Sequence, residues 1–152
     1  SNSSCRMFSI IVFIILTLDQ LTKFLASKNL ELNNPLPIIK GVFNLTLVYN
    51  RGAAFGIFKN QFYLFILSSI AAVILIYSVL KKNKRNNLYT FSLSLILGGA
   101  LGNLIDRIFL GYVVDFLDFR IWPVFNLADS AITLGALLLG WQIFIRERKN
   151  AS

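Results

Sequence analysis

The chain has 152 residues, of which 56% are hydrophobic and only 14% are charged, and its mean hydropathy is +0.67. A soluble domain carries about 25% charged residues, so this composition is that of an integral membrane protein. Histidine is absent and Cys5 is the only cysteine, which excludes Ser-His and Cys-His catalysis, an intrachain disulfide and a thiolate or imidazole zinc site. Any catalysis must depend on carboxylates, hydroxyls, lysines or a bound cofactor.

Four apolar stretches approach the roughly 20 helical residues that a bilayer core requires. They lie at residues 8–26, 62–80, 88–105 and 127–145. We therefore predict a mainly α-helical membrane protein in which residues 7–149 form one four-helix domain and residues 1–6 are a processed or appended N-terminal segment. An alternative interpretation of the first stretch is a cleaved signal peptide, because Arg6 precedes a largely apolar run.

The basic residues predict the orientation, because short loops rich in Lys and Arg stay in the cytoplasm. Four bases lie at positions 81–85, between the second and third stretches, and others lie near the chain ends at Arg6, Arg146, Arg148 and Lys149. Both termini are therefore expected in the cytoplasm. This pattern is an insertion signal, and no basic stripe interleaved with aromatics predicts a nucleic-acid partner.

Two segments on the opposite, outer side have the character of strands. Residues 42–50 alternate apolar with polar side chains, and Gly41 and Gly52 flank the alternation. Residues 112–119 are rich in Val and Phe and follow Gly111. We expect a small extramembrane β-sheet beside the helices.

Six of the seven acidic residues fall on the outer side or in the outer half of a span, where an ionisable residue is a candidate functional group. Asp19 and Lys23 are four positions apart, which places them on one helix face. Neutralisation of charge within that helix is favoured over a catalytic role for either residue.

The third stretch ends in a polar cluster at Asn103, Asp106 and Arg107. The preceding spacing of Gly98 and Gly102 allows close helix packing. Two interpretations of the cluster stay open: an Asp106–Arg107 pair that holds the helix end, or a pocket in which Arg107 and Asn103 position a polar substrate backbone.

Asp115 and Asp129 are the candidates for acid-base chemistry. Asp115 lies in an apolar run, where desolvation would raise its pKa, whereas Asp129 lies three residues after Asn126 in a helix-capping arrangement that favours an anion. If the strand folds back against the start of the fourth span, the two carboxyls meet in different protonation states, as acid-base chemistry on a peptide bond requires. Asp118, on the same strand, is a possible competitor for the role.

Five motifs, in order along nearly the whole chain, resemble those of the bacterial lipoprotein signal peptidases, also called signal peptidase II. They lie at residues 19–23, 50–56, 99–107, 113–116 and 125–130. The resemblance implies an aspartyl protease of the bacterial inner membrane, with four transmembrane helices, a periplasmic β-sheet and a short periplasmic helix. We expect a monomer without a cofactor, with membrane lipids as partners, that acts at the outer membrane face.

The resemblance also implies roles for individual residues. Asp115 and Asp129 would be a catalytic dyad that removes signal peptides from prolipoproteins, cutting just before a cysteine that carries a diacylglyceryl group. The residues that would line or support the dyad are Asn50, Gly99, Asn103, Arg107 and Asn126, and the structural polar positions are Asp19, Lys23 and Asp106.

Two rival functions use the same acidic residues differently. A small transporter would bind protons or cations at the boundary aspartates, but the sequence lacks an inverted repeat and its acids gather on one membrane side. A membrane assembly subunit would use Asp-Arg pairs as structural contacts without catalysis.

Overall fold

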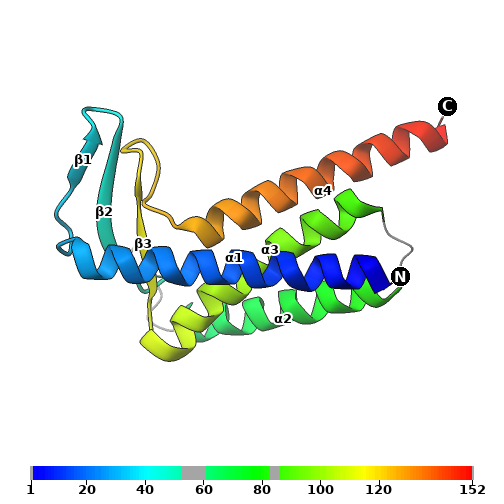
Figure 1. Ribbon diagram of the computed structural model, residues 1–152, viewed down its shortest axis with the longest axis horizontal. Helices are drawn as coiled ribbons and strands as arrows, with labels where there is room; N and C mark the ends of the chain where they lie inside the picture. Colours follow the sequence, from blue (N-terminus) through cyan, green and yellow to red (C-terminus); the bar gives the residue numbers. More distant parts are fainter. Residues whose placement is uncertain (1, 53–60, 83–85, 152) are drawn as a thin grey trace.

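The computed structural model describes residues 2–52, 61–82 and 86–151, and it contains four helices and one small sheet. The elements are α1 (Asn2–Asn29), β1 (Leu36–Ile39), β2 (Phe43–Asn50), α2 (Gln61–Lys82), α3 (Asn87–Leu110), β3 (Val113–Asp118) and α4 (Leu127–Ala151). The strands lie at one end of the helices, here called the sheet end, and both chain termini lie at the other, here called the terminal end (Figure 1). The expected mainly helical membrane architecture with a small sheet is confirmed.

Three of the helices are long and apolar enough to cross a membrane: Ser3–Asn29, Asn87–Leu110 and Leu127–Asn150. In α2 the apolar stretch within the described residues is Ser69–Ser78. The first helix begins at Asn2 and thus includes most of the segment 1–6, whose processed or appended origin stays a prediction. Positions 53–60, between β2 and α2, lie outside the described residues. If the expected short periplasmic helix falls at these positions, it lies outside the described residues as well.

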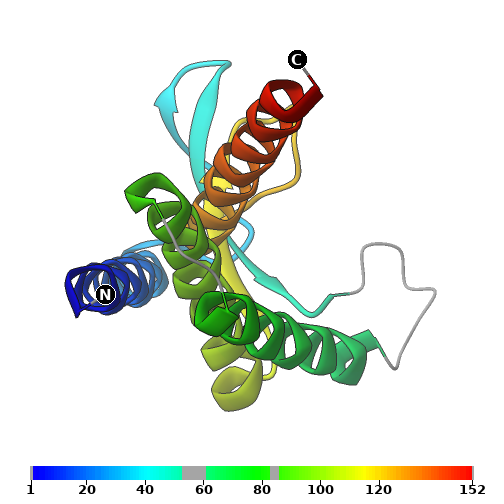
Figure 2. The same cartoon turned by 90° about the vertical axis from the view of Figure 1, so that its right-hand side faces the viewer.

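Helix α3 is the centre of the bundle, with α1, α2 and α4 around it (Figure 2). Of its apolar stretch 67% is buried, against 11% in α1 and 17% in α4, whose apolar side chains are left to face lipid. Polar residues fit in this central helix because their hydroxyls bond to backbone carbonyls four residues earlier, as Ser92 does to Leu88 and Ser94 to Thr90.

Small residues let the other helices approach α3 closely. A Cβ at Gly98 would meet Ile15 of α1, and one at Gly102 would meet the Asp19 carboxylate one turn further on, so the predicted packing of Gly98 and Gly102 is found against α1. A Cβ at Gly99 would meet the backbone carbonyl of Ala128. Gly99 therefore sets how closely the start of α4 lies against α3.

The three strands form an antiparallel sheet in the order β1-β2-β3. Both strands predicted from the sequence, β2 and β3, are confirmed, while β1 was not predicted. The register pairs Val48 with Asp115, and the sheet packs on the end of α1 through a small core of Ala26, Leu47, Val114 and Phe116. Strand β3 thus holds Asp115 against the polar sheet end of the bundle.

Replacing Gly99 by Ala tests the contact between α3 and α4. The added methyl meets the Ala128 carbonyl, which cannot move without shifting α4, and overpacking of this kind costs about 1–3 kcal/mol. We expect a lower melting temperature for the purified protein in detergent. Gly140→Ala is the matched control, because a Cβ there meets nothing within 4 Å. Equal melting temperatures for the two variants would contradict this packing.

Candidate active site

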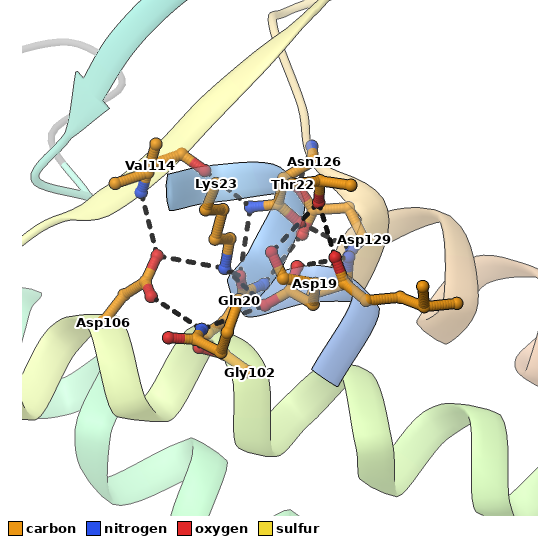
Figure 3. A network of polar contacts seen from close by, with 12 residues as sticks. Asp19, Gln20, Thr22, Lys23, Gly102, Asp106, Val114, Asn126 and Asp129 are labelled. Carbon is orange, nitrogen blue, oxygen red and sulfur yellow. Dashed lines mark hydrogen bonds and ion pairs between the residues drawn. The ribbon is translucent and has the colours of Figure 1, made fainter. Parts of the chain in front are cut away.

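The sheet end contains a buried charge cluster centred on Lys23 of α1 (Figure 3). The Lys23 ammonium lies 2.8 Å from Asp19 Oδ2 and 3.0 Å from Asp106 Oδ2, and it donates a hydrogen bond of 3.0 Å to Asn103 Oδ1. None of the three charged side chains is more than 3% exposed. The predicted pairing of Asp19 and Lys23 within α1 is found, and the same ammonium also joins α1 to α3.

The two carboxylates of this cluster bind further segments of the chain. Asp19 Oδ1 accepts the backbone N–H of Ala128 at 2.9 Å, and Asp106 Oδ2 accepts the backbone N–H of Val114 at 3.0 Å. The Gln20 amide donates to both Asp19 and Asp106. One buried cluster of charged groups therefore fixes where β3 and α4 begin relative to α1 and α3.

The start of α4 is held by a reciprocal cap. The Asp129 N–H donates to Asn126 Oδ1 at 2.9 Å, and the Asn126 N–H donates to Asp129 Oδ2 at 3.2 Å. This is the capping arrangement predicted from the three-residue spacing. It leaves the second Asp129 oxygen, and the whole Asn126 side-chain NH₂ group, available to other partners.

Two asparagine amides connect Asp115 with Asp129. The Asn126 Nδ2 donates to Asp115 Oδ1 at 2.7 Å and to Asn103 Oδ1 at 3.1 Å, while Asn103 Nδ2 donates to Asp129 Oδ1 at 3.0 Å. The other Asp115 oxygen accepts from Asn50 Nδ2 at 3.1 Å. The strand does fold back against the start of α4, and the backbone of Leu117 pairs with that of Phe125 beside it.

Asp115 on β3 is only 2% exposed, and burial raises its pKa from 3.8 to about 7. The negative charge of Asp129 adds to the rise, while the hydrogen bonds from Asn50 and Asn126 oppose it. The direction is the one predicted from the apolar run around Asp115. This carboxyl is therefore protonated in slightly acidic water and titrates near neutrality.

Asp118 occupies a different environment. Its carboxylate accepts hydrogen bonds from Thr46 Oγ1 at 2.7 Å and from the backbone N–H of Arg120 at 2.8 Å, and the bond from Thr46 is the main reason that its pKa is lowered. An ionised carboxylate with its own partners on the neighbouring strand is a poor competitor for the role of Asp115.

Arg107 and the 50–56 motif are the remaining predicted positions. Arg107 Nη1 donates to Ser69 Oγ of α2 at 3.2 Å, and the guanidinium lies in electrostatic range of Asp129, Asp106 and Asp115. In the motif, residues 50–52 are described and residues 53–56 lie outside the described part of the chain. Among the described residues no group of three acidic side chains or cysteines is arranged to hold a metal ion.

The sequence interpretation missed several contributors to the site. Gln20 stands between two predicted residues but was given no role, and the backbone N–H groups of Val114 and Ala128 carry no side-chain signal. Ser69 is one of three serines in the apolar helix α2, and nothing in the sequence distinguishes it from the other two. Only the position of Gln20, beside Asp19 in the first motif, could have drawn attention to it.

Known proteins match this chain along most of its length. The family described as signal peptidase (SPase) II matches residues 11–145. A lipoprotein signal peptidase of Halothermothrix orenii is 49% identical over 142 residues, which cover 93% of this chain and 98% of the relative. One from Caldanaerobacter subterraneus is also 49% identical, covering 92% of this chain and 97% of the relative.

Solved structures share the fold. A bacterial membrane enzyme determined by the in meso method at 1.9 Å superimposes with a TM-score of 0.84 at 32% identity, covering 90% of this chain and 91% of the other. A second, at 2.3 Å, gives a TM-score of 0.81 at 33% identity, with 95% and 89% of the two chains covered.

Lys23→Met tests the dependence of the site on the buried ammonium. The substitution leaves Asp19 and Asp106 buried without their counter-ion, and breaking a buried pair in this way costs about 3–5 kcal/mol. We expect a large drop in the melting temperature in detergent. Lys28→Met is the control, because Lys28 is an exposed lysine of the same helix.

The triple variant Asp19→Asn, Lys23→Met, Asp106→Asn carries no unpaired charge. It should recover part of the stability lost in Lys23→Met, since an amide oxygen at each position still accepts from Ala128 or Val114. Equal melting temperatures for Lys23→Met and Lys28→Met would contradict the role given to the cluster.

Proposed function

Because this chain belongs to the signal peptidase II family, we propose that it is a lipoprotein signal peptidase in which Asp115 and Asp129 activate water between them. The observation that carries the proposal is the pair of amides, Asn103 and Asn126, that donate to both carboxylates. Donors on both carboxylates allow two acids to lie close together around one proton. Without such donors, repulsion between the two charges would separate them.

The proposed chemistry is direct hydrolysis without a covalent intermediate. In the resting enzyme Asp115 holds the shared proton and Asp129 is the anion. Asp129 takes a proton from the attacking water as the water oxygen bonds to the scissile carbonyl carbon, and Asp115 gives its proton to the carbonyl oxygen, which forms a gem-diol. Asp129 then gives its proton to the peptide nitrogen while Asp115 regains one from a gem-diol hydroxyl, so the C–N bond breaks and leaves a carboxylic acid and a free amine. The raised pKa of Asp115, about 7, supports this division of roles, and the negative charge of Asp129 contributes to the rise.

The developing oxyanion needs donors besides Asp115. Arg107 lies in electrostatic range of both dyad residues, and Asn50 already donates to Asp115. A well-placed donor to an oxyanion contributes about 3–4 kcal/mol to the transition state in a soluble protease. We assign Arg107 and Asn50 to this stabilisation and to holding the substrate backbone.

The proposed substrate is a prolipoprotein whose signal peptide is cut just before a diacylglyceryl-modified cysteine. The relatives that match the chain are lipoprotein signal peptidases, which supports this substrate class. The proposed topology places the chain in the bacterial inner membrane with both termini in the cytoplasm and the sheet end at the periplasmic face. The common position of the termini, away from the sheet, and the basic residues of the terminal end support it (Figure 1).

Amide substitutions of the dyad test the mechanism. Asp115→Asn and Asp129→Asn each remove a group that must gain or lose a proton, and we expect cleavage of a lipid-modified prolipoprotein to fall about 100- to 10,000-fold. Asp118→Asn is the matched control on the same strand and should cleave at close to the normal rate. Gel mobility of the precursor measures cleavage, and melting temperatures establish that each variant is folded. Normal cleavage by either dyad variant would refute the assignment.

The pH dependence provides a second test. Below about pH 7 the free enzyme holds the proton on Asp115, and as the pH rises through about 7 that proton is lost together with the general acid. We expect kcat/KM for cleavage to fall on the alkaline side with a midpoint near 7. Values of kcat/KM that stay level from about pH 6 to about pH 9 would contradict an Asp115 proton in the mechanism.

A further inference from the structure

A cleft lies at the terminal end of the bundle, between the start of α3 and the end of α4. Its volume is about 670 Å³, and the polar and aromatic residues that line it include Asn86, Tyr89, Trp141, Gln142, Arg146 and Lys149. In α4, Asp129 and Arg146 are 17 residues apart, which is about 26 Å along a helix and close to the thickness of a bilayer core. The cleft is therefore at the opposite membrane face from Asp115 and Asp129, and none of the proposed catalytic groups reaches it.

The aromatic residues place the cleft at the boundary between hydrocarbon and water. Trp141 is 60% exposed, and Tyr89 also lines the cleft. Trp and Tyr gather at the level of the lipid headgroups, where one end of the ring is apolar and the other is hydrated. Arg146 lies about 8 Å further along α4 than Trp141, so its guanidinium is at the level of a lipid phosphate.

The charge of the cleft is positive. Arg146 and Lys149 both line it, and within the described residues no acidic side chain does. The start of α3, capped by Asn86, lies at the same cleft and adds the positive end of its helix dipole. The nearby Arg148 faces away, over the ring of Phe144 at 5.8 Å.

Gln142 supplies an acceptor that has no donor among the described residues. Its Nε2 donates to Ser92 Oγ and to the carbonyl of Leu138, both at 3.0 Å. Because a backbone carbonyl can only accept, the Leu138 contact fixes the orientation of the amide. Oε1 is then a buried acceptor for which the described residues provide no partner, and a hydroxyl of a bound molecule would satisfy it.

From these features we propose that the cleft binds one anionic phospholipid with a hydroxyl-bearing headgroup, of the phosphatidylglycerol type. Arg146 and Lys149 hold the phosphate, the headgroup folds back so that Gln142, about one helical turn deeper, accepts its hydroxyl, and the acyl chains run past Trp141 and Ile143 toward the bilayer centre. Basic pockets between membrane helices bind anionic headgroups in this way.

The test uses the purified full chain in a neutral detergent. Phosphatidylglycerol, phosphatidylcholine and glycerol 3-phosphate are added separately, and bound molecules are counted by native mass spectrometry alongside the melting temperature. We expect tighter binding of phosphatidylglycerol than of phosphatidylcholine by about tenfold or more, because each basic residue near an anionic lipid contributes about fivefold. Glycerol 3-phosphate, which lacks acyl chains, should neither remain bound nor raise the melting temperature.

Two double variants separate a built site from diffuse attraction. Arg146→Gln with Lys149→Gln should abolish the preference for phosphatidylglycerol. Arg6→Gln with Arg148→Gln removes the same charge from the same end of the bundle outside the cleft and should preserve it. The proposal is overturned if the two lipids bind equally, if both double variants lose the preference to the same extent, or if glycerol 3-phosphate binds as well as the lipid.

Discussion

The ammonium group of Lys23 is buried between two carboxylates, at 2.8 Å from Asp19 and 3.0 Å from Asp106, and the sheet end of the bundle is organised around it. A buried ion is costly unless its charge and all of its hydrogen-bonding capacity are matched. Here the two carboxylates also accept hydrogen bonds from the backbone N–H groups of Ala128 and Val114. These bonds form only if α4 and β3 begin at fixed places beside the cluster. The three buried charged groups are therefore stabilised only when α1, α3, β3 and α4 are assembled together.

The same ammonium sets the direction of the amides beside it. Lys23 can only donate, so Asn103 must turn Oδ1 toward it, which leaves Asn103 Nδ2 to donate to Asp129. Asn126 Nδ2 then has Asn103 Oδ1 and Asp115 as acceptors. A chain of oriented donors thus runs from a charge in α1 to both members of the proposed dyad. Lys23, which was predicted to be structural, therefore orients the amides that hold the two proposed catalytic residues in place.

Spacing along the sequence predicted the contacts between residues that are three or four positions apart. The four-residue step from Asp19 to Lys23 and the three-residue step from Asn126 to Asp129 gave the ion pair and the cap. The pairing of Lys23 with Asp106 spans 83 positions, and no periodicity indicates it. Strand β1 was missed because all four of its residues are exposed and Pro37 interrupts it, so it has no alternation and is tolerated only at a sheet edge. Only the resemblance of the five motifs to a known family predicted that these distant segments share one site, because spacing and periodicity carry no such information.

The central claim is that Asp115 carries a proton in mildly acidic solution and loses it near neutrality, while the amides of Asn103 and Asn126 hold Asp129 beside it. Isotope-edited infrared spectroscopy on aspartate-labelled protein observes the C=O stretch of a protonated carboxyl directly, and the spectrum of Asp115→Asn identifies which band belongs to Asp115. We predict one protonated carboxyl that is absent from Asp115→Asn and that titrates at about 7 in the unmodified protein. An Asp115 that is already fully ionised in mildly acidic solution would contradict the account.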